Sequence, residues 1–364
     1  MAEREHEQER RRTRISKKKA RRRRRKRILL FFEGLLILVL LVGAYVALKF
    51  DKLNITPIND DKDIHFNPQV KENTTLKEYT NIALFGIDSR DESLGDGNRS
   101  DTMIVASINN KTHEVKLVSV YRDSYLMIPK DEDIQYNKAN LAYFYGGPKM
   151  SINLLNSNLD LDITDFVSVN FSALIDTIDA LGGIDIEIND YERQYINGYM
   201  TETSKITGKE IIPLNESGLV HLNGLQATSY CRIRQTKGDD YKRTERQRLV
   251  ISKIVEKAKK ADLLTLNSLI DKVLPNVSTS LDVAEIYSLA KDAAKYELVD
   301  NTGFPFDLQS KDMGKKGDCV IPLNLEKNVS KLHEWLFGAQ EYQVSEKIKE
   351  ISNKIKEDSG LGGD

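Results

Sequence analysis

The chain has 364 residues, a formal net charge of −1, 40% hydrophobic residues and 30% charged residues. Residues 1–27 contain 15 Lys and Arg and 4 Glu, a charge of +11, so the rest of the chain carries −12. This separation of charge excludes a simple cytosolic globule and excludes a basic nucleic-acid-binding domain as the main body. The Leu, Ile and Val content of the body excludes general disorder and allows a buried core in one large or two ordinary domains.

An apolar segment follows the basic residues. Residues 28–48 read ILLFFEGLLILVLLVGAYVAL, with Glu33 as the only charged residue. Twenty-one residues at about 1.5 Å per residue give about 31 Å of helix, enough to cross a hydrocarbon core of about 30 Å. A cleaved signal peptide has a shorter apolar core and a small-residue cleavage site. The sequence therefore predicts a transmembrane signal anchor at 28–48.

The basic residues 1–27 predict the orientation of this anchor. Because Lys and Arg stay on the cytoplasmic side, we expect a basic cytoplasmic arm and an extracellular body, as in a single-pass type II protein of the cell membrane. Membrane topology and contact with anionic lipid explain the arm, and we expect no nucleic-acid partner.

The exported body begins with a polar segment, residues 49–79, which has no sustained periodicity and is predicted to be an extracellular stalk. The following region, 80–338, alternates strands and helices, and 339–364 are predicted as a C-terminal helix with a flexible tail. Expected strands are 81–87, 102–108, 115–120, 166–171, 184–188, 304–308 and 318–322. Expected helices are 138–158, 172–181, 223–233, 241–261, 263–274, 282–296 and 325–337. This order predicts an α/β (mixed α+β) fold with a central mixed β-sheet flanked by helices.

The body contains two cysteines, Cys231 and Cys319. Outside the cell a disulfide between them is permissible, but two cysteines also occur by chance, so the sequence leaves their pairing open. The five histidines are scattered and no CxxC motif is present, which argues against a zinc site.

Charged residues gather where the first three strands end or begin. Asp88 follows the first strand, Arg99 and Asp101 precede the second, and Arg122 follows the third. Two loops at one sheet edge can bring both carboxylates together, and Mg²⁺ is usually held by one or two carboxylates plus substrate phosphates. The alternative is that each aspartate caps a turn or pairs with a neighbouring arginine.

A second cluster contains most of the arginines of the body. Arg232 and Arg234 are two residues apart, so in an extended segment their side chains would point the same way. Asp240 is a plausible N-cap for the next helix, on which Arg243 and Gln247 lie at i and i+4. Arginines near a helix N-terminus suit a phosphate or pyrophosphate, and a solvated basic face is the alternative. Nucleotide-binding, serine-hydrolase and zinc-protease motifs are absent.

Seven segments in order resemble the LytR-CpsA-Psr family of envelope phosphotransferases. They are NIALFGIDSR (81–90), RSDTMIVASIN (99–109), VSVYRDSYLMIP (118–129), KANLAYFYGGP (138–148), DFVSVNF (165–171), IDALGGIDI (178–186) and HLNGLQATSYCRIRQTKGDDYKRTERQRLV (221–250). The resemblance implies that 80–338 is a catalytic domain with a hydrophobic polyprenyl-binding pocket. It also implies transfer of a polyprenyl-diphosphate-linked glycopolymer (teichoic acid, capsule or another wall polysaccharide) to a peptidoglycan sugar hydroxyl in a Gram-positive cell wall.

The resemblance also assigns roles to residues. It implies that Asp88 and Asp101 hold Mg²⁺ or Mn²⁺. The residues implied to contact the pyrophosphate are Arg99, Arg122, Arg232, Arg234, Arg243 and Gln247. The implied catalytic set is Asp88, Asp101, Arg122, Arg232 and Arg234. Such a cluster neutralises the attacked phosphate and the leaving polyprenyl phosphate. An aspartate not committed to metal can take the proton of the attacking hydroxyl.

Two other functions remain open at this point. A regulatory membrane protein, of the transcription-attenuator type, is one, although the short cytoplasmic arm has no helix-turn-helix pattern. A polyprenyl-pyrophosphate hydrolase or a non-catalytic lipid binder is the other, because it needs the same cation cluster.

Overall fold

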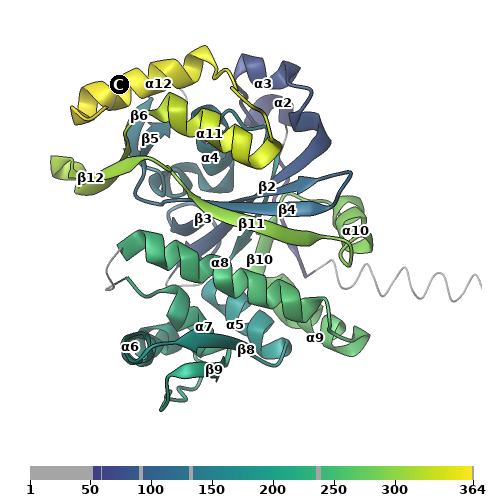
Figure 1. Ribbon diagram of the computed structural model, residues 1–364. Coiled ribbons are helices and arrows are strands. Elements are labelled where there is room, and N and C mark those ends of the chain that lie inside the picture. The colour runs from purple at the N-terminus through teal and green to yellow at the C-terminus, as the bar shows by residue number, and fades with distance from the viewer. Residues whose placement is uncertain (1–51, 59, 90–92, 131–133, 235–238, 363–364) are drawn as a thin grey trace, which may run out of the picture. The chain divides into compact units, whose positions relative to one another are not determined.

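A seven-stranded mixed β-sheet lies at the centre of the computed structural model, which describes residues 52–58, 60–89, 93–130, 134–234 and 239–362 (Figure 1). In order across the sheet the strands are β1 (Asn54–Ile55), β10 (Val277–Thr279), β7 (Asp165–Val169), β2 (Tyr79–Asp88), β3 (Arg99–Asn109), β4 (Glu114–Val120) and β11 (Glu297–Phe304). β2 runs parallel to β7 and antiparallel to β3, and β4 runs antiparallel to β3 and parallel to β11. The mixed sheet predicted from the sequence is confirmed.

One face of this sheet carries the main hydrophobic core. It is covered by three helices and two hairpins (Figure 1): α4 (Leu141–Leu159), α11 (Leu325–Phe337), α12 (Glu346–Ser359), β5 (Tyr125–Ile128) with β6 (Gln135–Lys138), and β12 (Leu308–Asp312) with β13 (Asp318–Pro322). Phe85, Met103 and Val118 of the central strands are buried in this core. Their neighbours Leu84, Ile104 and Leu117 belong to a separate small cluster, because successive side chains of a strand point to opposite faces.

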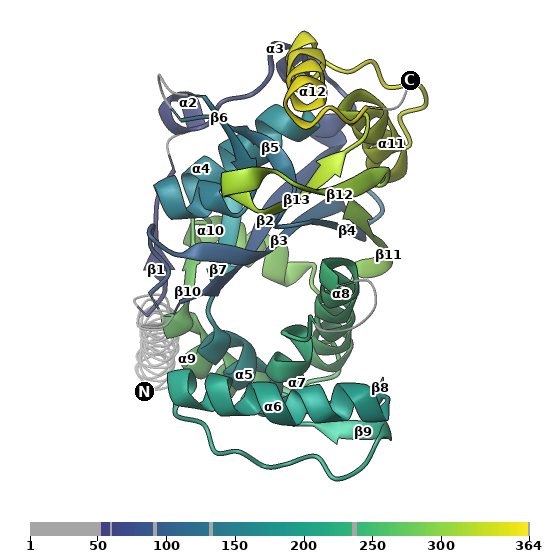
Figure 2. The same cartoon turned by 90° about the vertical axis from the view of Figure 1, so that its left-hand side faces the viewer.

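The opposite side of the molecule has a second layer with a core of its own (Figure 2). This layer consists of α5 (Phe171–Ala180), β8 (Ile184–Ile188), α6 (Asp190–Thr207), β9 (Gly218–Leu222), α7 (Gly224–Cys231) and α8 (Asp239–Ala258). Its core joins Ile175, Ile186, Ile196 and Leu225. Since the two cores are separate, the second layer does not close tightly on the sheet, and this arrangement leaves room for a cavity.

Further short helical elements complete the described part of the chain. They are α2 (Asp60–Asp63), α3 (Pro68–Glu72), α9 (Leu263–Val273), α10 (Val283–Lys291) and the 3₁₀ turns Leu76–Glu78, Leu274–Asn276 and Gly314–Lys316. Polar residues at helix N-termini fix where several helices begin. Asn189 and Glu192 form a reciprocal capping box at the start of α6, and Asn223 and Gln226 form another at the start of α7.

The predicted stalk is wrong for the described part of residues 49–79. Leu53, Ile64, Val70 and Leu76 are buried, and β1 joins the central sheet by parallel pairing with β10. Residues 53–364 form one compact unit. The predicted C-terminal helix is confirmed as α12, and it packs into the main core through residues spaced three and four apart: Ile348, Ile351 and Ile355.

Other predictions differ from the structure in their bounds or fall outside it. The helix predicted at 282–296 ends at Lys291, and the strand predicted at 304–308 covers the end of β11 and the start of β12. The cytoplasmic arm 1–27 and the anchor 28–48 lie outside the described residues. Within the described residues, the helices are all too short or too polar to span a bilayer.

One buried histidine makes the stability of this fold dependent on pH. His333 of α11 stacks on Tyr342 at 3.7 Å between ring centroids, and its Nε2 donates to the carbonyl oxygen of Leu159 at 2.9 Å. Burial lowers the pKa of His333 from 6.5 to about 4. The unfolded chain therefore binds a proton below about pH 6.5 that the folded protein excludes, so the free energy of unfolding falls as the pH drops from 6.5 towards 4.

We expect His333 to account for a loss of about 2 to 3 kcal/mol in the free energy of unfolding between pH 7 and pH 4.5. Urea titrations at both pH values measure it. His333→Gln should reduce the loss by that amount, whereas His65→Gln, at an exposed histidine, should leave the loss unchanged. Equal losses in wild type and in His333→Gln would contradict this assignment.

Candidate active site

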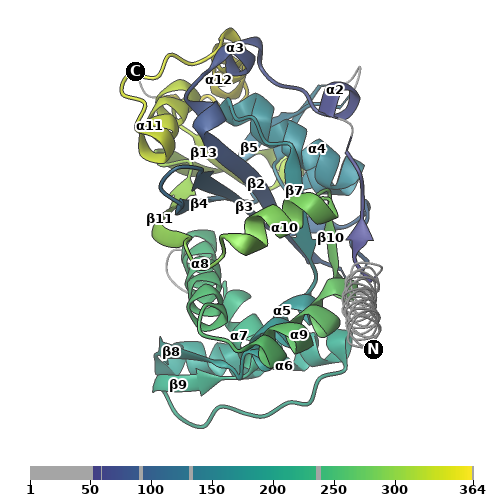
Figure 3. The same ribbon diagram turned by 90° about the vertical axis from the view of Figure 1, so that its right-hand side faces the viewer.

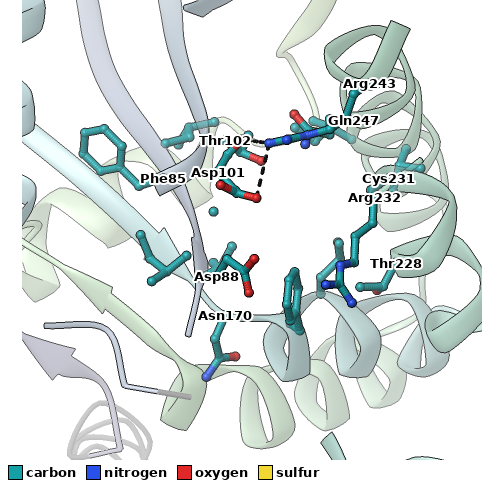
Figure 4. Close-up of a pocket in the computed structure, with 18 of the residues that line it drawn as sticks. Phe85, Asp88, Asp101, Thr102, Asn170, Thr228, Cys231, Arg232, Arg243 and Gln247 are labelled. Atoms are coloured by element: carbon teal, nitrogen blue, oxygen red, sulfur yellow. Dashed lines mark hydrogen bonds and ion pairs between the residues drawn. The ribbon is translucent and has the colours of Figure 1, made fainter. Parts of the chain in front are cut away.

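A cavity of about 510 Å³ lies between the central sheet and the second layer (Figure 4). Its walls come from β2, β3 and β7 on the sheet side and from α5, α6, α7 and α8 on the other side. Along β2 the lining runs from Leu84 to Asp88, and along α8 it runs from Ile251 to Arg243. The charged ends of these elements meet. Arg243 of α8 contacts Asp101 of β3, and Asp101 lies two residues from Arg99, which pairs with Asp88 of β2. The cavity therefore has a charged end and an apolar end.

Asp101 of β3 organises the charged end. One carboxylate oxygen, Oδ1, accepts from Nη1 of Arg122 at 2.6 Å, and the other, Oδ2, accepts from Nη2 of Arg234 at 2.7 Å. Arg243 of α8 places its Nη2 at 3.6 Å from Oδ2 and also donates to the backbone carbonyl of Asp101. Three arginines from three distant segments thus converge on one carboxylate.

The charge of Asp101 is stabilised by these neighbours. Burial alone would raise the pKa of Asp101, but the guanidinium groups of Arg243, Arg122 and Arg234 outweigh burial and hold its pKa below the usual value. Asp101 is therefore ionised at neutral pH, and its charge in turn compensates part of the positive charge around it.

Asp88, at the end of β2, has the opposite environment. Burial and the negative charge of Asp101 raise the pKa of Asp88, and Arg232 and Arg234 only partly offset this effect. Its carboxylate and that of Asp101 face the same space in Figure 4. The two aspartates predicted from the sequence are thus brought together at one end of the cavity.

Arg232 is held in place from several sides. It is the C-cap of α7, and its guanidinium donates to Oγ1 of Thr203 at 2.8 Å and to a carboxylate oxygen of Glu202 at 3.1 Å. The same group lies over the rings of Phe171 and Tyr199, at 4.8 and 5.6 Å from their centroids. Cation–π contacts and charged hydrogen bonds together fix its position at the cavity.

A buried ion pair supports the segment that carries Arg232 and Arg234. Arg246 of α8 donates from Nε to Glu192 of α6 at 3.0 Å and from Nη1 to the carbonyl oxygen of Ile233 at 3.3 Å. Because Ile233 lies between the two cavity arginines, this pair ties their backbone to both α6 and α8. No role was predicted for Glu192 or Arg246 from the sequence.

The other end of the cavity is apolar. Its lining includes Leu84, Ile104, Val167, Val169, Leu174, Val250 and Ile251. Arg243, Gln247 and Val250 follow one another at helical spacing, so a single face of α8 leads from the charged end to the apolar end. Such a cavity fits a ligand with an anionic head and a hydrocarbon tail.

The structure brings most of the predicted site residues together. Those lining the cavity are Asp88, Asp101, Arg232, Arg234, Arg243 and Gln247. Arg122 does not line it but contacts Asp101, whereas Arg99 is exposed on β3 and is not part of the lining. Glu202, Thr203 and the two aromatic rings that hold Arg232 were not predicted from the sequence. The predicted N-cap position of Asp240 is wrong, because α8 begins at Asp239 and Asp240 lies inside the helix.

The structure corrects the expected extended pair of arginines and answers the open question of the disulfide. Arg232 has helical backbone angles (φ −94°, ψ −10°) and binds partners on α6, so it and Arg234 do not form the expected extended pair. The disulfide that the sequence left open is not formed. Cys231 is a free thiol in the core of the second layer, and Cys319 is a free thiol in the main core on the other side of the sheet.

The charges at the cavity bear on whether a divalent cation fits there. Among the described residues that line it, the three carboxylates of Asp88, Asp101 and Glu202 balance three arginines. A pyrophosphate would need further positive charge in such a neutral lining. In the described part of the chain, neither Asp88 nor Asp101 belongs to a group of three or more His, Cys, Asp or Glu that could hold a metal ion without other ligands. Two carboxylates completed by phosphate oxygens are nevertheless a donor set that suits Mg²⁺.

Comparisons with known proteins agree with this geometry. The model of the LytR_cpsA_psr family matches residues 44–334. The polyisoprenyl-teichoic acid–peptidoglycan teichoic acid transferase TagU of Enterococcus faecalis is 33% identical over 248 residues, which are 65% of this chain and 74% of that protein. The TagU of Oceanobacillus iheyensis is 30% identical over 274 residues, 71% of this chain and 79% of that protein.

A solved structure shows the same fold. The LytR-CPS2A-psr family protein YwtF (TagT) with bound octaprenyl pyrophosphate lipid has a TM-score of 0.53 and 20% identity, and the match covers 84% of this chain and all of that one. The family match over most of the chain confirms the resemblance found in the sequence. The chain belongs to the LytR_cpsA_psr family.

Proposed function

We propose that this protein transfers a polyprenyl-diphosphate-linked anionic glycopolymer to a sugar hydroxyl of peptidoglycan. The observation that carries the proposal is the cavity itself, in which arginines gather at one end and aliphatic side chains line the other. A lipid pyrophosphate likewise has an anionic head and a hydrocarbon tail. The names of the TagU relatives support teichoic acid as the class of polymer and peptidoglycan as the acceptor.

The reaction breaks the phosphoanhydride bond of the lipid diphosphate and forms a phosphodiester bond to the acceptor sugar. The oxygen of the acceptor hydroxyl attacks the phosphorus that bears the glycopolymer, and its proton passes through solvent to the departing polyprenyl phosphate. The bond from that phosphorus to the bridging oxygen breaks, and polyprenyl phosphate leaves. Arg232, Arg234 and Arg243 stabilise the negative charge that the phosphoryl and leaving-group oxygens carry in the transition state.

The residues around the arginines prepare the site before substrate arrives. Asp101 holds Arg122, Arg234 and Arg243 in one place, and Thr203 and Glu202 hold Arg232. Because these groups are already oriented, they need little reorganisation during the reaction. The aliphatic walls exclude water from the lipid and set the direction in which its chain lies.

Asp88 and Asp101 would hold Mg²⁺ or Mn²⁺. A bound divalent cation would place positive charge beside the pyrophosphate oxygens. The described lining of the cavity has no net positive charge of its own to do so.

We also propose that residues 28–48 anchor the protein as a single-pass type II membrane protein with its body outside the cell. The apolar length of this segment and the basic residues 1–27 support this topology. It places the body on the side of the membrane where peptidoglycan lies.

Replacement of Arg232 tests the proposed function. With a lipid-linked glycopolymer and peptidoglycan as substrates, Arg232→Ala should lower the rate of polymer attachment by about 10²–10³-fold, as does loss of a charge-stabilising donor in other enzymes. Arg99→Ala is the matched control, because Arg99 is exposed and outside the cavity lining, and it should retain the wild-type rate within about threefold.

The product distinguishes transfer from the alternatives. Polymer joined covalently to peptidoglycan supports the transferase, whereas polymer released free in the same assay identifies a pyrophosphate hydrolase. A lipid binder or a regulator predicts neither product. Equal effects of Arg232→Ala and Arg99→Ala would remove the catalytic role from the cavity.

A further inference from the structure

Two amphipathic helices of the body leave apolar side chains in solvent. Leu264, at the start of α9, is 81% exposed, and Tyr287 of α10 is 70% exposed, with Val283 one turn before it on the same side of the helix. None of the residues of α10 is buried, although six of its nine residues are apolar or aromatic in the sequence VAEIYSLAK. The core of the protein therefore does not explain the apolar side chains of α10.

The two helices belong to one face of the body. They are joined through the 3₁₀ turn Leu274–Asn276 and β10, and Figure 3 shows both on the side that faces the viewer. We call the exposed apolar side chains of Ile55, Leu264, Val283 and Tyr287 on β1, α9 and α10 the α9–α10 face. Single exposed apolar residues are normal on a protein surface, but a set of them on one face of the body, on two successive helices, indicates an interaction site.

The chain that leads to the body restricts where this face lies. The predicted anchor ends at residue 48, and residues 49–52 span at most about 14 Å before Leu53. The next residues form β1, which pairs with β10 at Asn54–Ser278 and Ile55–Thr279. β10 is the strand between α9 and α10, so a membrane anchor at 28–48 keeps the α9–α10 face close to the bilayer.

The cavity points in the same direction. Its lining along α8 changes from Arg243 and Gln247 to Val250 and Ile251, and α8 then continues towards its end at Ala258 and into α9. The apolar end is thus the end nearer to α9. A lipid tail lying in the cavity would leave the body on the side where the α9–α10 face is exposed.

We propose that the α9–α10 face docks on the surface of the lipid bilayer, with Leu264, Val283 and Tyr287 inserted at the headgroup level. Amphipathic helices with leucine and aromatic side chains lie in this interface, and tyrosine is enriched there. The docking itself rests on the predicted anchor. Its consequence, direct passage of a polyprenyl chain from the bilayer into the apolar end of the cavity, rests on the proposed function.

Depth-dependent quenching tests the docking. In the full chain, reconstituted into phosphatidylcholine–phosphatidylglycerol vesicles, Leu264→Cys is labelled with an environment-sensitive fluorophore; both native thiols are buried. Leu219→Cys on β9 is the matched control, since Leu219 is 74% exposed and belongs to the layer of α6, β8 and β9. Spin-labelled lipids should quench the label at 264 roughly threefold or more compared with the label at 219.

Two results of the same assay would contradict the docking. Equal, weak quenching at 264 and 219 would overturn the proposal, and so would protection of the label at 264 that depends on protein concentration, because the face would then cover a second copy of the chain. Tyr287→Cys repeats the test on α10.

Lipid uptake separates docking from the proposed function. The double variant Leu264→Glu with Tyr287→Glu should take up polyprenyl diphosphate from vesicles about tenfold more slowly than wild type. It should bind dimethylallyl diphosphate, which has no long tail, as wild type does. Deep quenching of the label in Leu264→Cys, together with no uptake of polyprenyl diphosphate by wild type, would support the docking and contradict the proposed function. Unchanged uptake by the double variant would contradict the passage of lipid through this face.

Discussion

Asp101→Asn is expected to lower the rate of polymer attachment by about 10²–10³-fold, with a much smaller change in the affinity for polyprenyl diphosphate. The carboxylate of Asp101 contacts Arg122, Arg234 and Arg243, and it is also a proposed ligand of the divalent cation. The amide keeps the size of the side chain but removes its charge, so the three guanidinium groups lose their common partner. Removal of a negative charge from an anion site does not by itself weaken anion binding.

Parallel measurements of binding and of initial transfer rate check this prediction. Asp185→Asn is the control, because Asp185 is an exposed aspartate of β8 paired with His221 at 2.7 Å and outside the cavity lining. Its rate should match that of wild type. A transfer rate for Asp101→Asn within about threefold of wild type would show that the carboxylate does not organise the site.

Ile251→Trp is expected to weaken binding of a long polyprenyl diphosphate selectively. Ile251 lines the apolar end of the cavity, about one turn of α8 beyond Gln247, so an indole there occupies the space of the lipid chain. Exclusion of one five-carbon isoprene unit removes about 2 to 4 kcal/mol of binding free energy, or a Kd increase of about 30- to 1,000-fold.

Two ligands and one neighbouring variant make this prediction specific. Dimethylallyl diphosphate has a single isoprene unit, and its affinity should not change. Leu249→Trp places the same side chain two residues away at a position that is exposed and does not line the cavity, so it should bind both ligands as wild type does. Equal losses for long and short ligands would show that the indole damages the charged end rather than the lipid path.

The sequence alone predicts elements whose residues form a strong local pattern. β8 and α11 occur at the predicted bounds 184–188 and 325–337, and the strands at 81–87, 102–108 and 115–120 are found one to four residues longer. The short apolar runs of these strands and the apolar stripe of α11 are local patterns that predict burial without knowledge of distant partners.

Elements defined by distant partners were not predictable in this way. β1 is only two residues long and exists because it pairs with β10, more than 220 residues away in the chain. Leu53, Ile64 and Leu76 are buried without regular spacing, so residues 49–79 resemble a stalk in the sequence. The helix α6 was also missed, although the capping box of Asn189 and Glu192 was a readable start signal.

In the site, too, local spacing predicted some residues and could not predict partners from distant segments. Arg243 and Gln247 were expected on one helical face, and both line the cavity. The partners of Arg232 could not be inferred from spacing, because Glu202 and Thr203 lie 30 and 29 residues earlier on another helix. Arg99 was included because it belongs to the same motif as Asp101, but its side chain is exposed outside the cavity lining.

The lipid that accompanies the purified protein tests the central claim most directly. The full chain is extracted in mild detergent, and its bound lipids are identified by mass spectrometry beside Arg232→Ala and Arg99→Ala. We expect a polyprenyl phosphate or diphosphate in wild type and in Arg99→Ala, at a level at least about tenfold lower in Arg232→Ala. Wild type that carries no such lipid and binds no added polyprenyl diphosphate, with or without Mg²⁺, would contradict the assignment of this cavity to a lipid pyrophosphate.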